Sequence, residues 1–161
     1  MESALAFGPI DLTPIVPGLF ISDWPEAGDA PRLEADGIRL LLSMHWRRPP
    51  AVYRRPPFET VWLPTIDSPF TPLPLRSLLR GVQTALPVLE RGEGVLAHCV
   101  FGRHRGVAMG CCVLIGMGRT AEEAMALVAA KRAVADPYVG YIRRRIEAFE
   151  REWGRRRTLS G

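Results

Sequence analysis

One cysteine of this sequence ends an apolar run and is followed closely by a cluster of cations. In VLAHCVFGRHRG, residues 95–106, Cys99 precedes Arg103, His104 and Arg105 by a few positions. An apolar strand ending at the cysteine, then a loop and a helix, would direct backbone N–H groups and the helix N-terminus at one point above the sulfur. That point attracts an anion, and the same positive charge favours the thiolate form of the cysteine. The stretch therefore predicts a nucleophilic thiolate beside a bound anion.

Two residues of this stretch suit an anion with several oxygens. Gly102 has no side chain, so the backbone can curl around the anion without filling the space it needs. Arg105 carries a planar, permanently charged guanidinium whose N–H groups match two oxygens of one phosphate, a geometry that lysine does not reproduce. The predicted anion is therefore a phosphate group.

The same residues make up a motif of the form H-C-x5-R. It consists of His98, Cys99, Val100, Phe101, Gly102, Arg103, His104 and Arg105. Here the sequence resembles the compact members of the dual-specificity branch of the cysteine-dependent protein tyrosine phosphatases, over roughly residues 14–150. The resemblance implies a phosphatase in which Cys99 attacks phosphorus to form a phosphocysteine intermediate, while Arg105 and the loop amides hold the phosphate oxygens. It implies no metal and no other cofactor.

The resemblance also assigns the remaining site residues. His98 would hold the nucleophile loop by a side-chain hydrogen bond, and the substrate-binding residues as a group would be His98, Val100, Phe101, Gly102, Arg103, His104 and Gly106. The family takes the proton for the leaving group from an aspartate on a mobile loop about thirty residues before the cysteine. In LPTIDSPFTPLP, Asp67 stands 32 residues before Cys99 and is therefore expected to be the general acid.

Gly106 departs from the family pattern. Many dual-specificity phosphatases have serine or threonine after the arginine, and this hydroxyl helps the thiolate leave when the intermediate is hydrolysed. We expect Gly106 to slow that step, unless the glycine is needed for its backbone conformation or for close packing at the helix start. In addition, the G-R-H-R of the loop is similar to the G-K-H-R of plant and fungal atypical dual-specificity phosphatases, some of which act on inositol pyrophosphates.

Several functions remain open at this point. The leading hypothesis is a dual-specificity protein phosphatase, whose partner is a phosphorylated protein or a small polyanionic phosphate. Phosphatases of the same fold also act on inositol polyphosphates, phosphoinositides or RNA 5′-phosphates, and the RNA 5′-end is the only nucleic-acid partner that we expect. A phosphate-binding module with little turnover is disfavoured by the intact Cys99, Asp67 and Arg105. A rhodanese-like sulfurtransferase is disfavoured because its active-site loop is generally shorter.

The elements that must position these residues alternate between strand and helix patterns. Strands are predicted at 15–22, 37–44, 58–64 and 94–99, and helices at 73–92, 107–118, 121–132 and from Pro137 to about Trp153. Pro87 is expected to kink the first helix or to begin a new turn, and Thr120 with Glu123 forms a capping box. The pattern predicts one α/β domain with a mostly parallel, twisted sheet of four to five strands and helices on both faces. Ligands bind beyond the carboxyl ends of such strands, where Cys99 stands.

Composition agrees with one soluble domain. The chain has 161 residues, 47% of them hydrophobic and 24% charged, with a net charge of +4. Its core is expected at about 14–153, followed by a basic, flexible tail at 154–161. No apolar run approaches the ~20 residues of a membrane span, and the start lacks the features of a secretory signal. We therefore expect a cytoplasmic protein without membrane association.

Other reactive or charged residues have simpler interpretations. Cys111 and Cys112 are expected to be buried packing residues of a helix. The arginine pairs at 47–48 and 54–55 lie between prolines and are more often part of a solvated loop than of a substrate-facing patch.

Overall fold

A computed structural model describes residues 8–161, and its first element is a hairpin. Strands β1 (Leu12–Val16) and β2 (Leu19–Ser22) pair antiparallel, with Leu12 opposite Ser22. The single strand predicted at 15–22 is therefore wrong. Gly18 has φ +88°, which lets the chain reverse between the two strands.

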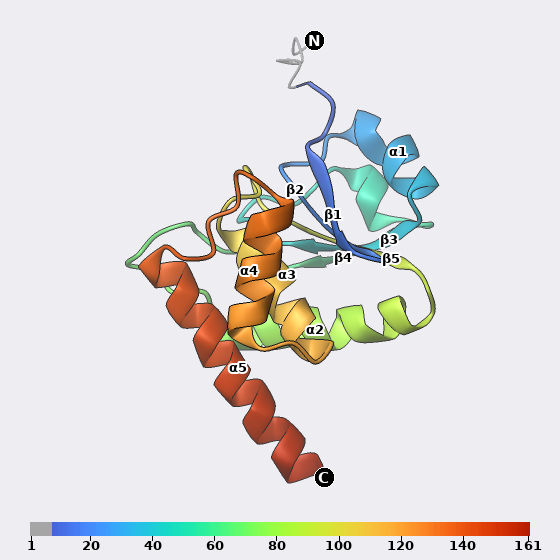
Figure 1. Ribbon diagram of the computed structural model, residues 1–161. Helices are drawn as coiled ribbons and strands as arrows, with labels where there is room; N and C mark the ends of the chain where they lie inside the picture. Colours follow the sequence, from blue (N-terminus) through green and yellow to red (C-terminus); the bar gives the residue numbers. More distant parts are fainter. Residues whose placement is uncertain (1–7) are drawn as a thin grey trace.

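The sheet has five strands in the order β1-β2-β5-β3-β4 (Figure 1). Strands β3 (Ile38–Ser43), β4 (Glu59–Trp62) and β5 (Gly94–His98) follow the hairpin, and β2, β5, β3 and β4 all run parallel. The predicted, mostly parallel sheet is confirmed. Because β5 is the central strand, the residue that follows it, Cys99, leaves the sheet in the middle of its carboxyl edge.

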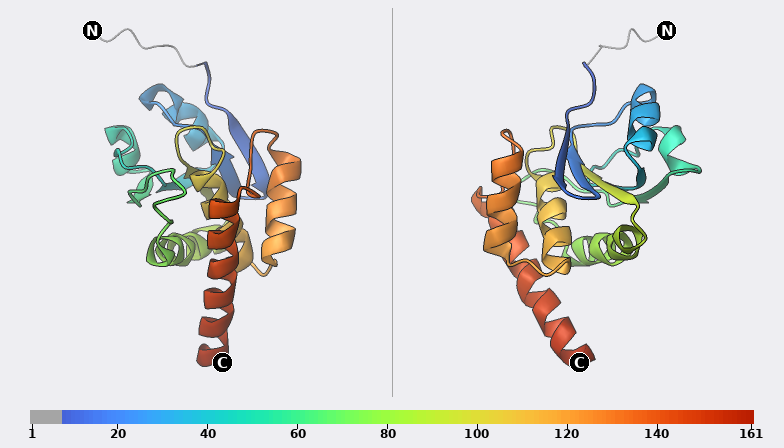
Figure 2. Two further views of the ribbon diagram at one scale, coloured as in Figure 1. Left: turned by 90° about the vertical axis from the view of Figure 1, so that its left-hand side faces the viewer. Right: turned by 45° about the vertical axis from the view of Figure 1, so that its right-hand side comes forward.

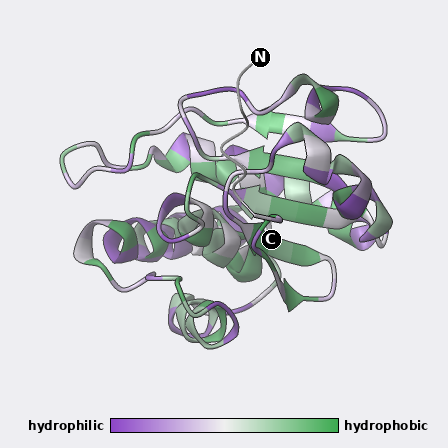
Figure 3. Cartoon of the chain, turned by 90° about the horizontal axis from the view of Figure 1, so that it is seen from above, coloured by the Kyte–Doolittle hydropathy of each residue, from purple (hydrophilic) through white to green (hydrophobic). Residues whose placement is uncertain are grey.

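Helices cover both faces of the sheet, as predicted (Figure 2). One face carries α2 (Leu75–Glu90), α3 (Arg105–Gly116), α4 (Ala121–Lys131) and α5 (Gly140–Ser160). The other face carries the short helix α1 (Ala30–Ala35) with the 3-10 turns η1 (Ala27–Asp29) and η2 (Ala51–Arg54). Seen from above, the strands are mostly hydrophobic, and the helices around them show both hydrophobic and hydrophilic residues (Figure 3). A buried sheet covered by helices whose outer sides face solvent has this pattern.

Helix α3 is the buried centre of its layer. Every residue from Arg105 to Ile115 is buried, because α3 lies between the sheet and helices α2, α4 and α5. Its glycines allow close approach: a Cβ at Gly110 would lie 2.6 Å from a side-chain carbon of Ile21 on β2. Helix α3 and the loop that precedes it are therefore held rigidly against the sheet.

One helix ends later than expected. Helix α5 does not end near Trp153 but continues to Ser160, and Glu152 pairs with Arg155 at 2.6 Å and with Arg156 at 2.9 Å. Such pairs, three and four residues apart, favour helix in an exposed segment. Helix α2 continues through Pro87 to Glu90 as one helix, and only its last turn follows the proline. None of the helices within residues 8–161 has the length and apolarity that a membrane crossing needs.

Candidate active site

Residues 99–104 connect β5 to α3 and begin at the buried Cys99; we call them the nucleophile loop after the predicted role of Cys99. Gly102 has φ +63°, and a Cβ there would lie 2.5 Å from the backbone oxygen of Ser22. The glycine is therefore required both for its conformation and for its close approach to β2. The carbonyl of Val100 accepts a 2.9 Å hydrogen bond from the backbone N–H of Trp24, which fastens the loop to the segment after β2.

Arg132, directly after α4, fastens the same loop from the other side. Its guanidinium is 2% exposed and donates to the carbonyls of Gly102 at 2.8 Å and of Phe101 at 3.2 Å. It also bonds the Thr13 hydroxyl at 2.8 Å and pairs with the Asp11 carboxylate at 3.1 Å. One buried side chain therefore ties the nucleophile loop to the first strand.

Arg105 is the first residue of α3 and is 6% exposed. One guanidinium nitrogen, Nη1, donates a 2.8 Å hydrogen bond to the carbonyl of Thr65, in the loop that also carries Asp67. Its Nε–H is buried and has no hydrogen-bond partner within the described residues. A buried charged donor without a protein partner is costly, and an anion bound at the loop would satisfy it.

Asp67 lies against the nucleophile loop. Its Oδ2 is 2.9 Å from Nδ1 of His104, and its Oδ1 accepts a 2.6 Å hydrogen bond from the Tyr141 hydroxyl at the start of α5. Burial acts to raise the pKa of Asp67, but the hydrogen bonds from Tyr141 and His104, with the charges of His104 and Arg105, outweigh burial and lower it. Burial and the same contact with Asp67 raise the pKa of Tyr141 to about 12. The resting site therefore favours an ionised Asp67 and a protonated Tyr141.

His98 is fully buried at the end of β5. Its Nδ1 lies 3.3 Å from the carbonyl of Cys99, a distance at which the ring donates a hydrogen bond when Nδ1 carries the proton. The ring of Trp24 packs edge-on against it at 5.6 Å. Burial is the main cause that lowers the pKa of His98 to about 4, with smaller contributions from His45 and Arg105. A neutral His98 is therefore the stable form at neutral pH.

The other predicted substrate-binding residues have different surroundings. Phe101 is 74% exposed, Arg103 is also exposed, and Val100 is half-buried. The carbonyl of Arg103 accepts a hydrogen bond from the N–H of Asp136, which adds a further tether. The Nδ1 of His104 faces Asp67 and Tyr141, and its Nε2 is buried and has no hydrogen-bond partner among the described residues.

Gly106 packs against the strand that carries the nucleophile. A Cβ at Gly106 would lie 3.0 Å from the carbonyl carbon of His98 and 3.1 Å from the N of Cys99. Its φ is not positive, so close packing and not backbone conformation explains the glycine.

No group of three or more histidine, cysteine or acidic side chains in residues 8–161 has the arrangement of a metal site. Cys111 and Cys112 are fully buried, as predicted, and burial raises the pKa of both thiols.

No family model matches the chain. Among curated proteins, the human dual specificity protein phosphatase 22 is 30% identical over 141 residues, which cover 85% of this chain and 72% of the human protein. The chain is a dual specificity phosphatase. The mouse protein of the same name is 28% identical over 144 residues, covering 87% of this chain and 74% of the mouse protein. This enzyme therefore belongs to the cysteine-dependent phosphatases.

This dual specificity phosphatase also superposes on solved structures that share its fold. Human DUSP28 superposes with a TM-score of 0.80 at 22% identity, covering 91% of this chain and 97% of that one. PTPMT1 in complex with PI(5)P superposes with a TM-score of 0.81 at 22% identity, covering 90% and 97%. These likenesses confirm the protein tyrosine phosphatase-like fold.

Sequence reasoning missed three residues of this phosphatase's site. Tyr141 lies outside any motif, yet its hydroxyl bonds Asp67; a tyrosine in place of phenylalanine on the final amphipathic helix is the one signal that the sequence offers. Arg132 had no signal that separates it from the other arginines. Thr65 takes part through its backbone carbonyl, which no side-chain motif can reveal.

Proposed function

We propose that this dual specificity phosphatase uses Cys99 as nucleophile, Arg105 as the phosphate-binding cation and Asp67 as general acid, and that its substrates are phosphorylated proteins. The observation that carries the proposal is the buried, unpaired Nε–H of Arg105 on the helix that follows the Cys99 loop. A dianionic phosphate monoester in this loop would accept hydrogen bonds from that N–H group and from the backbone amides of the loop. Its phosphorus would then lie next to the Cys99 sulfur.

In the first step the Cys99 thiolate attacks phosphorus, an S–P bond forms and the P–O bond to the alcohol breaks. The leaving oxygen takes a proton from Asp67, which becomes a carboxylate. Tyr141 and His104 bond the two oxygens of Asp67, at 2.6 and 2.9 Å. We assign both as positioning residues, because each holds one oxygen of the acid.

In the second step water attacks phosphorus and gives a proton to Asp67, while the S–P bond breaks and the thiolate is regenerated. Arg105 also bonds the carbonyl of Thr65, which links the phosphate site to the loop that carries the acid. The acid and the nucleophile therefore stay in one arrangement through both steps. Since the mechanism needs a reduced thiol, we propose that the enzyme works in the cytoplasm.

The experiment compares the parent enzyme with Cys99→Ser and Asp67→Asn on aryl phosphates. We expect Cys99→Ser to abolish turnover and to retain phosphate binding. Asp67→Asn should slow poor leaving groups by about 10² to 10⁴ and good leaving groups much less. Equal slowing of all aryl phosphates would remove Asp67 from the role of acid, and undiminished turnover by Cys99→Ser would overturn covalent catalysis.

A substrate panel then tests the substrate class. It contains phosphotyrosine and phosphoserine peptides, inositol phosphates, a phosphoinositide in vesicles and a 5′-triphosphate RNA. Among these substrates, we expect a phosphopeptide to have the highest kcat/KM. A higher value with any of the other substrates would overturn the assignment to proteins while leaving the chemistry intact.

A further inference from the structure

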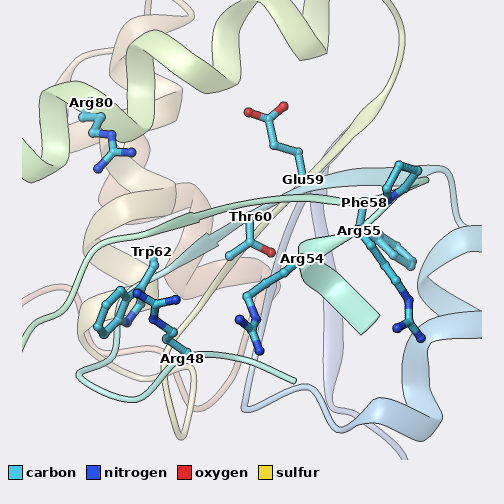
Figure 4. A pocket seen from close by; sticks show the side chains of 9 residues that line it. Arg48, Arg54, Arg55, Phe58, Glu59, Thr60, Trp62 and Arg80 are labelled. Carbon is cyan, nitrogen blue, oxygen red and sulfur yellow. The ribbon is translucent and has the colours of Figure 1, made fainter. Parts of the chain in front are cut away.

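A basic hollow lies at the edge of the sheet, outside the catalytic loop. It has a volume of about 480 Å³ and is lined by Arg48, Arg54, Arg55 and Arg80 together with Trp62 and Glu59. Figure 4 shows that these arginines come from three different parts of the chain: Arg48 from the segment after β3, Arg54 and Arg55 from η2 and its end, and Arg80 from α2. We refer to it as the edge groove.

The charges of the edge groove are unpaired. Within residues 8–161 none of its four arginines takes part in an ion pair or donates a side-chain hydrogen bond, and all four are exposed. Glu59 is the one carboxylate among the lining residues, so the groove has an excess of positive charge. A site with like charges gathered from separate elements favours an anionic partner.

Two further hollows lie between the edge groove and the catalytic side of the molecule. A second hollow shares Trp62 and Arg80 with it and adds Arg76 and Pro74. A third hollow shares Pro64 and Pro74 with the second and reaches Thr65, whose carbonyl accepts the hydrogen bond from Arg105. The three hollows therefore lie next to one another between the basic edge and the loop that carries Asp67, and we refer to this row of hollows as the path.

The sheet register places the path close to the nucleophile. Trp62, at the end of β4, and His98, at the end of β5, are both level with Ser43 of β3 between them. Neighbouring strands are about 4.8 Å apart, so the Trp62 end of the groove lies roughly 10 Å across the sheet from the start of the catalytic loop. A few residues of extended peptide span that separation.

The lining of the groove distinguishes a peptide from a nucleic acid. The guanidinium of Arg48 lies over the ring of Trp62 at 4.7 Å, and the Trp62 Nε1–H donates to the carbonyl of His45 at 2.8 Å. Phe58, the other aromatic lining residue, is buried. Single-stranded nucleic acids stack their bases on open aromatic faces, and the lining residues of this groove offer none, whereas its exposed guanidinium groups suit the carboxylates of glutamate and aspartate.

We propose that the edge groove binds an acidic peptide segment that flanks the phosphorylated residue of a protein substrate. The proposal rests on the phosphatase function assigned above and adds the class of protein on which it acts. The groove supplies binding energy away from the reacting phosphate, so it raises kcat/KM for acidic phosphoproteins and leaves small substrates unaffected.

The test compares Arg54→Glu/Arg80→Glu with a control, Arg151→Glu, that reverses an exposed charge of α5 outside the groove. Substrates are an aryl phosphate, a phosphotyrosine peptide flanked by glutamates and the same peptide flanked by glutamines. We expect the double variant to lose about tenfold or more in kcat/KM for the acidic peptide, since two attractions become repulsions, and to keep the other two values within about twofold. The control should retain all three, and equal losses on the acidic and neutral peptides would overturn the proposal.

A binding measurement separates the groove from the catalysis. The anisotropy of a labelled, unphosphorylated glutamate-rich peptide should report binding to the parent protein, weaker binding at high salt and loss of binding in the double variant. This readout needs no turnover, so an inactive enzyme that still binds the peptide would contradict the phosphatase mechanism and not the groove. Binding of a single-stranded RNA in preference to the peptide, lost in the double variant, would overturn the peptide as the occupant.

Discussion

The role of Tyr141 can be tested by removing a single atom, its hydroxyl oxygen. Its hydroxyl donates to Asp67 and is one cause of the lowered pKa of that carboxyl. In its proposed role as general acid, Asp67 acts only while it is protonated, so activity should fall as pH rises through its pKa. Removing the hydroxyl removes a bond to the ionised form, and the pKa of Asp67 should rise.

We therefore expect Tyr141→Phe to move the alkaline limb of the kcat/KM profile to higher pH. The value of kcat should also fall, by up to about tenfold, because one orienting hydrogen bond of ~0.5 to 1.5 kcal/mol is lost. The profile is measured with an aryl phosphate that has a poor leaving group. Tyr138→Phe, which removes an exposed hydroxyl nearby, is the control, and an alkaline limb that does not move in Tyr141→Phe would remove Tyr141 from this role.

Gly106 lacks a hydroxyl and also packs closely against the backbone. Two variants separate the effects of these two properties. A Cβ at this position would lie 3.0 Å from the backbone of His98, so both Gly106→Ala and Gly106→Ser should lower the melting temperature by similar amounts. The parent, without a hydroxyl here, should accumulate phosphocysteine and show a burst with an aryl phosphate. Relative to alanine, serine should speed the hydrolysis of the intermediate by about ten- to a hundredfold and shrink the burst. Rapid-quench kinetics decide: a parent without a burst, or equal turnover by the two variants, would show that another group assists the leaving thiolate.

At the scale of elements, the nucleophile loop depends on a side chain that is distant in sequence. Arg132 holds two carbonyls of this loop and reaches the first strand. In Arg132→Met these acceptors lose their donor inside the protein, which should cost about 2 kcal/mol or more of the free energy of unfolding. We also expect a higher KM for aryl phosphate, because the loop carbonyls are free to turn. Lys131→Met, an exposed neighbour, is the control; a variant of Arg132 with parental stability and KM would show that the loop holds its shape unaided.

Local patterns in the sequence predicted some of these elements and contacts and missed others. The parallel strands, the helices on both faces and the Cys99 loop follow from local patterns: apolar runs, a capping box and a motif within eight residues. The hairpin was missed because both of its strands are mostly apolar and read as one run, although Pro17 and Gly18 form a turn signal between them. The contacts of Tyr141 and Arg132 join residues 74 and 30 positions apart, so they depend on how helices and loops pack and not on any local pattern.

For the whole molecule, the buried His98 makes stability depend on pH. Its pKa is about 4 in the folded protein and near 6.5 when exposed, so between these values the unfolded chain binds more protons. The contribution of neutral His98 to the free energy of unfolding is therefore fully present above pH 6.5. It should be lost as pH decreases to 4, and the loss is on the order of 3 kcal/mol. Burial also lowers the pKa of His45, which acts in the same direction.

Denaturant unfolding across that pH range measures this loss. The His98→Gln variant should show a smaller decrease than the parent if it folds. In the folded parent, the ring resonances of His98 should titrate only near pH 4, which tests the same cause without a substitution. Titration of His98 near its ordinary value would show that burial does not govern this dependence.

The contacts of Asp67 and Arg105 across the two loops have a kinetic consequence. Since His104 bonds Asp67 and Arg105 bonds Thr65, protein contacts alone hold the acid loop against the nucleophile loop, and we expect the acid loop to keep its working position throughout the cycle. The population competent to react is then close to the whole population, and no fraction of binding energy goes into shifting a conformational equilibrium. Turnover of a good aryl phosphate should accordingly be insensitive to solvent viscosity, since loop closure takes no part in the cycle.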